Sequence, residues 1–361
     1  MKSILIVFIL IFISSCVFGA ESIKIIDPNN GAGTDYTSLA SFESTEQADV
    51  TAATGSDTQF TAKCRCTGGT ADVIANFNGW TTDAANYIKI WTDPAEGYRS
   101  TDGTYQTGNI YRIEGDVPLT LQEANIKVLG IELDHTGATT SSGIIYMVSI
   151  EGGGTIDIGY CILQNTAGAS GMRSIFASTG IDSATTLNVF NTVAVNANGY
   201  SCRTFDTDWT VNFYNCSFLG GDIAGIHQNS GGTVNVENCA ILESADDFSG
   251  TITITKCASD DNDAESVAES GGGTNWPDDF NDAANGDFTL VSGSNLIDAG
   301  TDDPSSGLYT DDIIGTTRSS YDIGAFEFDS GGGATFIPTI NITEYRLNSI
   351  LNNLGIIAGR N

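Results

Sequence analysis

The sequence predicts an all-β protein that folds as a single right-handed parallel β-helix, a solenoid with an N-terminal helical cap and a C-terminal cap. The first observation is a repeat: a seven-residue phrase that begins with Thr recurs at 155–161, 186–192, 210–216, 233–239 and 251–257. The second is the alternation of apolar and polar residues inside each copy, which has the period of a strand. Short strands repeated in this way form a core only by stacking, and parallel crossover connections favour a right-handed coil.

The alternation slips by one residue at the same place in every copy. In the fourth copy, Val234 and Val236 point inward, and the next inward candidates are Cys239 and Ile241. A strand that slips by one residue must bend or turn its side chains to the other face, so we predict a corner between two strands. Asparagine tolerates the left-handed backbone that a sharp corner needs. Three copies carry it at the slip: Asn191, Asn215 and Asn238.

The N-terminus has the pattern of an export signal. A single positive charge precedes an apolar run at 4–13, which is typical of a secretory signal peptide spanning 1–19 with cleavage before Ala20. The segment 13–16 also resembles a bacterial lipoprotein box, which would leave Cys16 as a lipidated N-terminus. Both routes remain open, and both predict an exported protein that is secreted or held at the cell surface.

The remaining elements follow in chain order. A strand is predicted at 23–27, and a short helix at 35–45 places Leu39 and Phe42 on one side, as a lid over the first coil requires. Near the C-terminus, 343–355 has the apolar spacing of a short amphipathic helix. We divide the chain into a signal peptide (1–19), an N-terminal strand and capping helix (20–57), the coils (58–262), C-terminal coils and cap (263–328), and a Gly linker with the amphipathic helix (329–361).

The charge of the chain is strongly acidic. It has 45 acidic and 14 basic residues, for a formal net charge of −31. Such a surface repels nucleic acid and anionic membranes unless cations intervene. We therefore expect no nucleic-acid partner, and membrane contact only through a lipid on Cys16. Caps that cover both ends of the coil favour a monomer.

Four cysteines occupy one repeat position: Cys161, Cys216, Cys239 and Cys257. Side chains at this position point inward just after the corner, so we predict a stack of buried thiols that fills the core. Neighbouring coils bring Cα atoms to about 4.8 Å, which is within the range of a disulfide, so an occasional bridge stays an alternative. Cys64 and Cys66 lie on one face of a predicted strand, but no His or further Cys stands at ligand spacing, so no zinc site is predicted there.

Phrases near the C-terminus resemble those of a known group of proteins. The segments 285–290 (NGDFTL), 294–300 (SNLIDAG) and 322–327 (DIGAFE) look like the terminal signature of secreted right-handed parallel β-helix repeat proteins in the pectate-lyase-like superfamily, in an uncharacterised branch. The resemblance covers roughly 24–328. It implies the fold and leaves the function open, because this superfamily includes lyases, hydrolases, adhesins and structural proteins.

The sequence assigns no catalytic residue. A polysaccharide lyase needs an Arg or Lys base, and a glycoside hydrolase needs paired carboxylates. The acid pairs are typical of turns, and His135 and His227 are expected to be ordinary surface residues. The basic residues of the coils lie in no phrase that matches a lyase motif: Lys89, Arg99, Arg112, Lys127, Arg173, Arg203 and Lys256.

An outward polar stripe is the predicted binding surface. Its members lie between the two inward positions of the first strand and should align one above another: Asp157, Asn188, Asn212 and Asn235. Such a ladder could hydrogen-bond the hydroxyl groups of an extended glycan, with Tyr214 and Trp209 as stacking surface. The alternative is a solvated face whose amides bond to each other along the stack.

Two functions follow. The first is an exported noncatalytic β-helix that binds a polysaccharide or surface glycan, or builds an extracellular structure. The alternative is a carbohydrate-active enzyme, a polysaccharide lyase or glycoside hydrolase, with an unrecognised site. No dedicated metal site or cofactor is expected, although acidic turns could bind Ca²⁺ loosely through clustered oxygens.

Overall fold

The structure is a computed structural model that describes residues 20–138, 142–168, 170–195, 198–205, 209–261 and 278–329. The predicted signal peptide, Cys16 and the helix predicted at 343–355 lie outside these residues. In the described part of the chain, no helix is long and apolar enough to cross a membrane.

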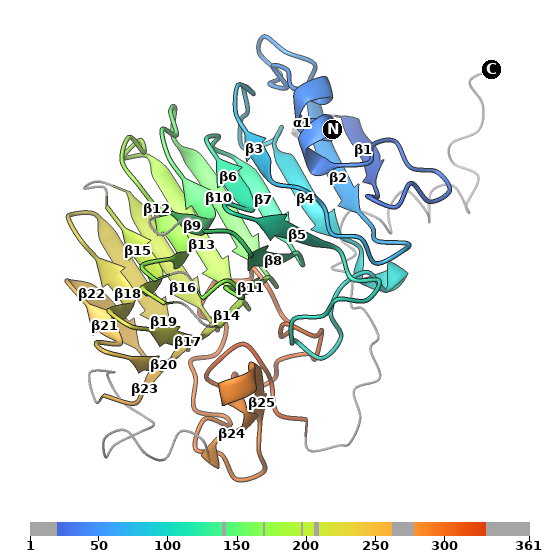
Figure 1. The fold of residues 1–361 in the computed structure, drawn as a ribbon. Helices are drawn as coiled ribbons and strands as arrows, with labels where there is room; N and C mark the ends of the chain where they lie inside the picture. The colour runs from blue at the N-terminus through green and yellow to red at the C-terminus, as the bar shows by residue number, and fades with distance from the viewer. Residues whose placement is uncertain are drawn as a thin grey trace, which may run out of the picture.

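The chain winds in coils that stack along one axis, and the strands of successive coils form three sheets of parallel strands (Figure 1). Sheet 1 contains β1 (Ala20–Ile26), β2 (Thr58–Cys64), β4 (Ile88–Thr92), β7 (Ile126–Leu129), β10 (Gly154–Gly159), β13 (Thr185–Phe190), β16 (Thr210–Tyr214), β19 (Thr233–Glu237) and β22 (Ile252–Thr255). Sheet 2 contains β5 (Arg112–Gly115), β8 (Glu132–His135), β11 (Ile162–Gln164), β14 (Val193–Val195), β17 (Ser217–Gly221), β20 (Ala240–Ser244) and β23 (Ala258–Ser259). Sheet 3 contains β3 (Ala75–Phe77), β6 (Leu119–Leu121), β9 (Gly143–Met147), β12 (Arg173–Ala177), β15 (Tyr200–Thr204), β18 (Ala224–Gln228) and β21 (Phe248–Ser249).

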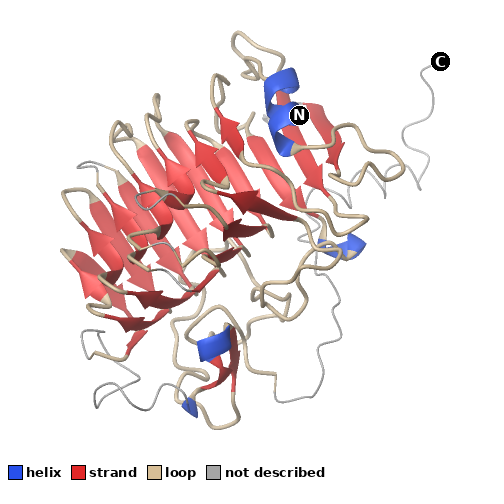
Figure 2. Cartoon of the chain, in the orientation of Figure 1, coloured by secondary structure: helices blue, strands red, loops and turns tan. Residues whose placement is uncertain are grey.

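One full coil visits each sheet once, as in β13, β14 and β15. Every strand then pairs in parallel with the strand one coil away, for example Val211 of β16 with Val234 of β19. The predicted all-β parallel β-helix is confirmed, and Figure 2 shows how strand dominates over helix. The side chains that alternate inward form a continuous core between the sheets.

The predicted corner lies between sheet 1 and sheet 2. Asn191, Asn215 and Asn238 have φ angles of 43°, 47° and 54°, so the chain takes the left-handed conformation there in successive coils. Tyr160 and Lys256 hold the same conformation at the equivalent place in their coils. The one-residue slip in the sequence therefore corresponds to a real bend.

The stack of cysteines is buried in the core. Cys161, Cys216, Cys239 and Cys257 are free thiols without solvent exposure, as are the other described cysteines. Burial raises the pKa of Cys161 to about 11. The prediction of a thiol stack is confirmed for this part of the chain.

The N-terminal end of the core lies under α1 (Leu39–Glu46). Ser38 caps this helix by accepting a hydrogen bond from the Ser41 backbone N–H at 3.1 Å. Leu39 and Phe42 are buried, and the Phe42 ring stacks on Trp80 with the ring centroids 6.1 Å apart. The side predicted to face the core does so.

The C-terminal part of the described chain, 278–329, covers the outer face of sheet 2. Figure 1 shows this orange segment beside the strands of that sheet rather than beyond the last coil. It adds no further parallel strand among the described residues, and instead pairs β24 (Phe280–Asp282) antiparallel with β25 (Asp287–Leu290), joined by a short 3-10 helix at Ala283–Asn285. Its apolar side chains pack on outward residues of the sheet such as Val193, Leu219 and Leu242.

The corner asparagines hold this segment in place. Asn191 donates to the Asp311 carbonyl at 2.7 Å, and Asn238 donates to the Thr301 carbonyl at 2.8 Å. Asn215 donates to the Asp322 carbonyl at 2.7 Å and accepts from the Tyr309 hydroxyl at 2.6 Å. All three side chains are buried, so the corner that bends the chain is also its docking site for the C-terminal segment.

Candidate functional site

The predicted stripe forms an aligned row on the outer face of sheet 1. The register pairs Asp157 with Asn188, Asn188 with Asn212, and Asn212 with Asn235. The side chains of these four residues, which we call the amide ladder, bond to each other from coil to coil. Each amide nitrogen donates to the next oxygen, Asn235 to Asn212 at 2.9 Å, Asn212 to Asn188 at 3.0 Å and Asn188 to Asp157 at 2.9 Å.

The amide ladder ends on an ion pair, because the Lys127 ammonium lies 3.4 Å from the second oxygen of Asp157. One N–H and one oxygen of every internal amide are therefore occupied within the protein. This is the internal arrangement named as the alternative in the sequence analysis. It stabilises the stack, and it leaves fewer polar atoms for a ligand.

The two aromatic candidates do not form a free surface beside the amide ladder. Trp209 is 1% exposed and belongs to the core, so the expectation that it offers a stacking surface is wrong. It precedes β16 directly, but its side chain points inward, which sequence proximity alone could not reveal. Tyr214 is half-buried and packs beside Phe190, Tyr309 and Tyr321, next to the C-terminal segment.

A groove of about 610 Å³ lies on the outer face of sheet 2. We call it the sheet 2 groove. Its floor is formed by Ile162, Gln164, Val193 and Val195, and its walls come from the turn before β5 and from the β24–β25 hairpin. The wall residues are Gly103, Thr104, Tyr105, Asp282, Ala284, Asn285, Gly286 and Asp287.

Tight turns fix both walls. In the first wall, Gly103 has a φ of 72°, and a Cβ there would lie 2.1 Å from the Phe326 ring, so only glycine fits against the C-terminal segment. In the second wall, Asn285 donates to Asp282 at 2.8 Å across the short 3-10 turn. Asp287 accepts from the Thr289 backbone at 3.0 Å. The first wall is thus held by close packing and the second by its own hydrogen bonds.

Three carboxylates continue the floor beyond Gln164, under the segment that precedes β5. The register places Asp134 beside Gln164 and Glu114 beside Asp134. Asp134 accepts from the Thr166 backbone and hydroxyl at 3.0 and 2.6 Å, and Glu114 accepts from Arg112 at 2.6 Å. The third acid, Glu132, is more deeply buried and accepts fewer hydrogen bonds than Asp134.

Glu132 is 2% exposed and accepts one hydrogen bond, from the Gln106 backbone at 2.9 Å. Its other oxygen has no partner among the described residues. Burial raises the pKa of Glu132 to about 8, with the nearby Arg112 opposing the shift. The carboxyl is therefore mostly protonated at neutral pH.

Both histidines were expected at the surface. His135 has no exposed area, and its Nδ1 lies 2.7 Å from the Asp116 carbonyl, so that expectation is wrong. It ends β8 two residues after the core residue Leu133, so its side chain lies on the inward face of the strand. His227 is half-buried on sheet 3, with its ring 5.1 Å from Tyr200.

Within the described ranges, no group of three or more His, Cys, Asp or Glu side chains is arranged to hold a metal ion. The loose binding of Ca²⁺ by acidic turns stays a prediction.

Comparisons of the chain with protein-family models, with curated proteins and with solved structures found no match.

The sheet 2 groove is not evident from the sequence, because its walls come from segments that are distant in sequence. One signal could have pointed to it. The strands Val193–Val195 and Ala240–Ser244 begin with three consecutive apolar residues, and such runs indicate burial on both faces of a sheet. An outer cover for sheet 2 was therefore predictable, although its shape was not.

Proposed function

We propose that this protein is an exported, noncatalytic β-helix protein that binds a glycan in the sheet 2 groove. The observation that carries the proposal is the chemistry of the groove. Its floor contains the apolar side chains of Ile162, Val193 and Val195, whereas Gln164 and Asn285 supply amide groups. A concave site with an apolar surface and a few polar groups is typical of small-ligand binding, and a sugar ring has both kinds of surface.

The polar groups of the groove can form hydrogen bonds with the hydroxyl groups of a sugar. The Gln164 side chain is not in any hydrogen bond identified within the described structure, so both its N–H donors and its oxygen are available. Asp287 uses one carboxylate oxygen to hold Thr289, and the other oxygen can accept from a sugar hydroxyl. Tyr105 adds an aromatic ring at the wall. Together they would orient a neutral or weakly charged sugar.

The burial and the internal hydrogen bonds of the nearby carboxylates support the noncatalytic part of the proposal. Asp134 and Glu114 are held by internal hydrogen bonds, and both Asp134 and Glu132 are buried under the segment before β5. A general acid must reach within hydrogen-bonding distance of the bond it cleaves. The alternative, a glycoside hydrolase, is favoured by Glu132, because a carboxyl that stays protonated at neutral pH could act as such an acid.

Export and family membership belong to the same proposal. The pattern of residues 1–19 supports secretion or a lipid anchor at Cys16, and the C-terminal phrases support a place in the pectate-lyase-like superfamily. The strong negative charge suits a soluble extracellular or cell-surface protein.

A glycan array read with and without Ca²⁺, followed by calorimetric titration of each hit, tests the proposal. Gln164→Ala and Asn285→Ala should each weaken binding by about fivefold, since a neutral hydrogen bond contributes about 1 kcal/mol. Asn212→Ala is the matched control, because it removes the same kind of group from the amide ladder.

Loss of binding in Asn212→Ala alone would move the site to the amide ladder. Failure of every neutral glycan to bind would overturn the groove as a sugar site. Each hit is also incubated with the protein, and release of reducing ends or unsaturated products that Glu132→Gln abolishes would establish the enzyme instead.

A further inference from the structure

Two arginines lie among aromatic rings on the outer face of sheet 3. Arg173 is on β12, with its guanidinium carbon 4.4 Å from the centre of the Phe176 ring and 5.7 Å from that of Tyr200. Arg203 is on the next strand, β15, with its guanidinium carbon 4.6 Å from the centre of the Tyr200 ring and 4.1 Å from that of Phe205. The two cations thus share the Tyr200 ring from neighbouring coils.

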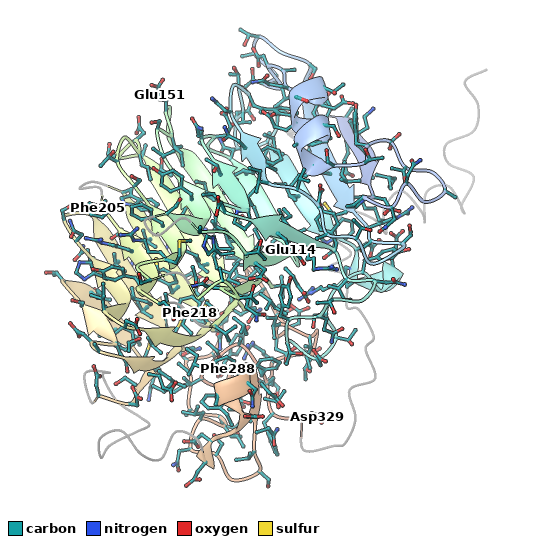
Figure 3. All side chains as sticks on the ribbon, viewed as in Figure 1. Glu114, Glu151, Phe205, Phe218, Phe288 and Asp329 are labelled. Carbon is teal, nitrogen blue, oxygen red and sulfur yellow. The ribbon has the colours of Figure 1, made fainter. Side chains whose placement is uncertain are left out.

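The rings form a connected patch around them. Tyr146 stacks on Phe176 at a centroid distance of 5.4 Å, and Phe176 meets Phe205 edge-to-face at 5.7 Å. The register aligns Tyr146, Phe176 and Arg203 in one outward row. Phe205 lies on the side of the solenoid where β12, β15 and β18 run (Figures 1 and 3). The sheet 3 patch is our name for these six residues: Tyr146, Arg173, Phe176, Tyr200, Arg203 and Phe205.

The arginines of the sheet 3 patch have no ion pair with a described carboxylate. Their environment differs from that of Arg65, Arg112 and Arg318, each of which is ion-paired with a glutamate. Arg203 donates to the Asn229 side-chain oxygen at 3.0 Å. Within the described structure, Nε and Nη1 of Arg173 and Nε of Arg203 are shielded from water and have no hydrogen-bond acceptor.

This arrangement is unfavourable without a counter-ion. Burial and the neighbouring Arg203 both lower the pKa of Arg173, which reflects two like charges placed together. The chain has 45 acidic residues and a net charge of −31, so a pair of guanidinium groups without an acidic partner among the described residues is unexpected. An anion bound beside the two half-buried guanidinium groups would offset the repulsion between them.

The geometry points to a sulfate ester on a sugar as that anion: we propose that Arg173 and Arg203 bind the sulfate group while the half-buried rings of Tyr146 and Phe205 pack against the sugar ring. A sulfate ester has three free oxygens, so it can accept from both guanidinium forks, whereas the two oxygens of a carboxylate match one fork. A phosphate monoester has the same shape but carries about −1.5 to −2 charges, and the negative field of the chain opposes each added charge.

This inference shares with the proposed function only the assumption that the ligand is a glycan. It concerns a different face of the solenoid and different residues, so the two can fail separately. Gln164→Ala should weaken the binding of a neutral glycan without changing the advantage that a sulfate group gives. Arg203→Gln should do the reverse.

Calorimetric titration with a sulfated galactose tetrasaccharide, its desulfated form, its phosphorylated form and a uronate tetrasaccharide tests the inference. We expect the sulfated form to bind at least tenfold more tightly than the other three. Arg173→Gln and Arg203→Gln should each lower the affinity for it by about ten- to a hundredfold, since a hydrogen bond to a charged group contributes about 1.5–3 kcal/mol.

Two further variants define the chemistry. Arg203→Lys keeps the charge but not the planar fork, so it should retain part of the affinity. Lys89→Gln is the matched control, because it removes one positive charge from the outer face of sheet 1 and should leave the affinity unchanged. Equal loss in Lys89→Gln and Arg203→Gln would show a general charge effect and overturn the site.

Chemical modification of the unaltered protein keeps the test valid if an arginine variant fails to fold. Phenylglyoxal modifies arginine side chains, and mass spectrometry identifies which peptides are modified. The sulfated tetrasaccharide should protect the peptides that contain Arg173 and Arg203 and leave Arg65 unaffected. Absence of protection, or tighter binding of the uronate or desulfated form, would overturn the inference.

Discussion

Asn215 shows how much one residue contributes to this fold. Its backbone takes a φ of 47° at the corner, and its side chain donates to the Asp322 and Gly324 carbonyls of the C-terminal segment. The residue type was predictable from the slip in the repeat. The second role was not, because the sequence does not reveal which segment returns to the corner.

Substitutions at this corner should separate the two roles. Asn215→Gly removes the side-chain hydrogen bonds together with the Cβ, whereas Asn215→Ala removes the hydrogen bonds but keeps a Cβ in the left-handed conformation, which costs about 1 kcal/mol more than glycine. We expect both variants to lower the free energy of unfolding in urea, with Ala about 1 kcal/mol less stable than Gly. Equal stability of the two variants would mean that the corner is not strained.

Glu132 should make stability depend on pH. Its pKa is raised from 4.5 to about 8 in the folded protein, so the folded state keeps a proton that the unfolded state releases. The free energy of unfolding should therefore fall as the pH rises from about 4.5 to 8. Other buried acids titrate in the same range, so the measurement compares the unaltered protein with Glu132→Gln, whose stability should fall less. Parallel pH profiles for the two proteins would contradict the buried, protonated carboxyl.

At the scale of elements, the repeat predicts the coils because every copy of its first strand has the same period and the same corner. It does not predict the partners of the outward faces. The strands β14, β17 and β20 of sheet 2 are apolar on their outer face and need the C-terminal segment as a cover. Arg173 and Arg203 meet only through the register of sheet 3. The strands of that sheet share no sequence motif, so their alignment could not be read from the repeat.

Substitution of Phe326 tests whether the C-terminal segment packs on the outer face of sheet 2. The Phe326 ring is buried against the sheet and lies directly beside Gly103 in the wall of the groove. Phe326→Ala should lower the free energy of unfolding by about 3–5 kcal/mol and weaken glycan binding as the wall relaxes. Ile223→Ala is the control, since Ile223 is 50% exposed and should change stability little. A Phe326→Ala protein with unaltered stability would show that the segment is not packed as described.

The cysteine stack gives a chemical test of the coil. In the mature chain without 1–19, the described thiols should not react with a disulfide reagent until the protein unfolds, because they are buried and burial raises the pKa of residues such as Cys202 and Cys239. The mass of the native protein, measured by mass spectrometry, should be that of a chain whose cysteines are all reduced. Rapid reaction in the native state would contradict the inward placement of the stack.

At the scale of the whole molecule, the solenoid presents three different outer faces. Sheet 1 carries the amide ladder, sheet 2 carries the C-terminal segment and the groove, and sheet 3 carries the arginine and aromatic patch. Of these, the ladder was predictable residue by residue, since it lies within the repeat. The other two depend on segments outside it, and they contain the better candidates for binding.

The most direct test of the account is a crystal structure of the mature protein with a neutral glycan identified on the array. The account predicts an intact sugar in the sheet 2 groove, with a ring over Val193 and Val195 and hydroxyl groups bonded to Gln164 and Asn285. A glycan bound along the amide ladder instead, or a cleaved glycan beside an exposed Glu132, would contradict it.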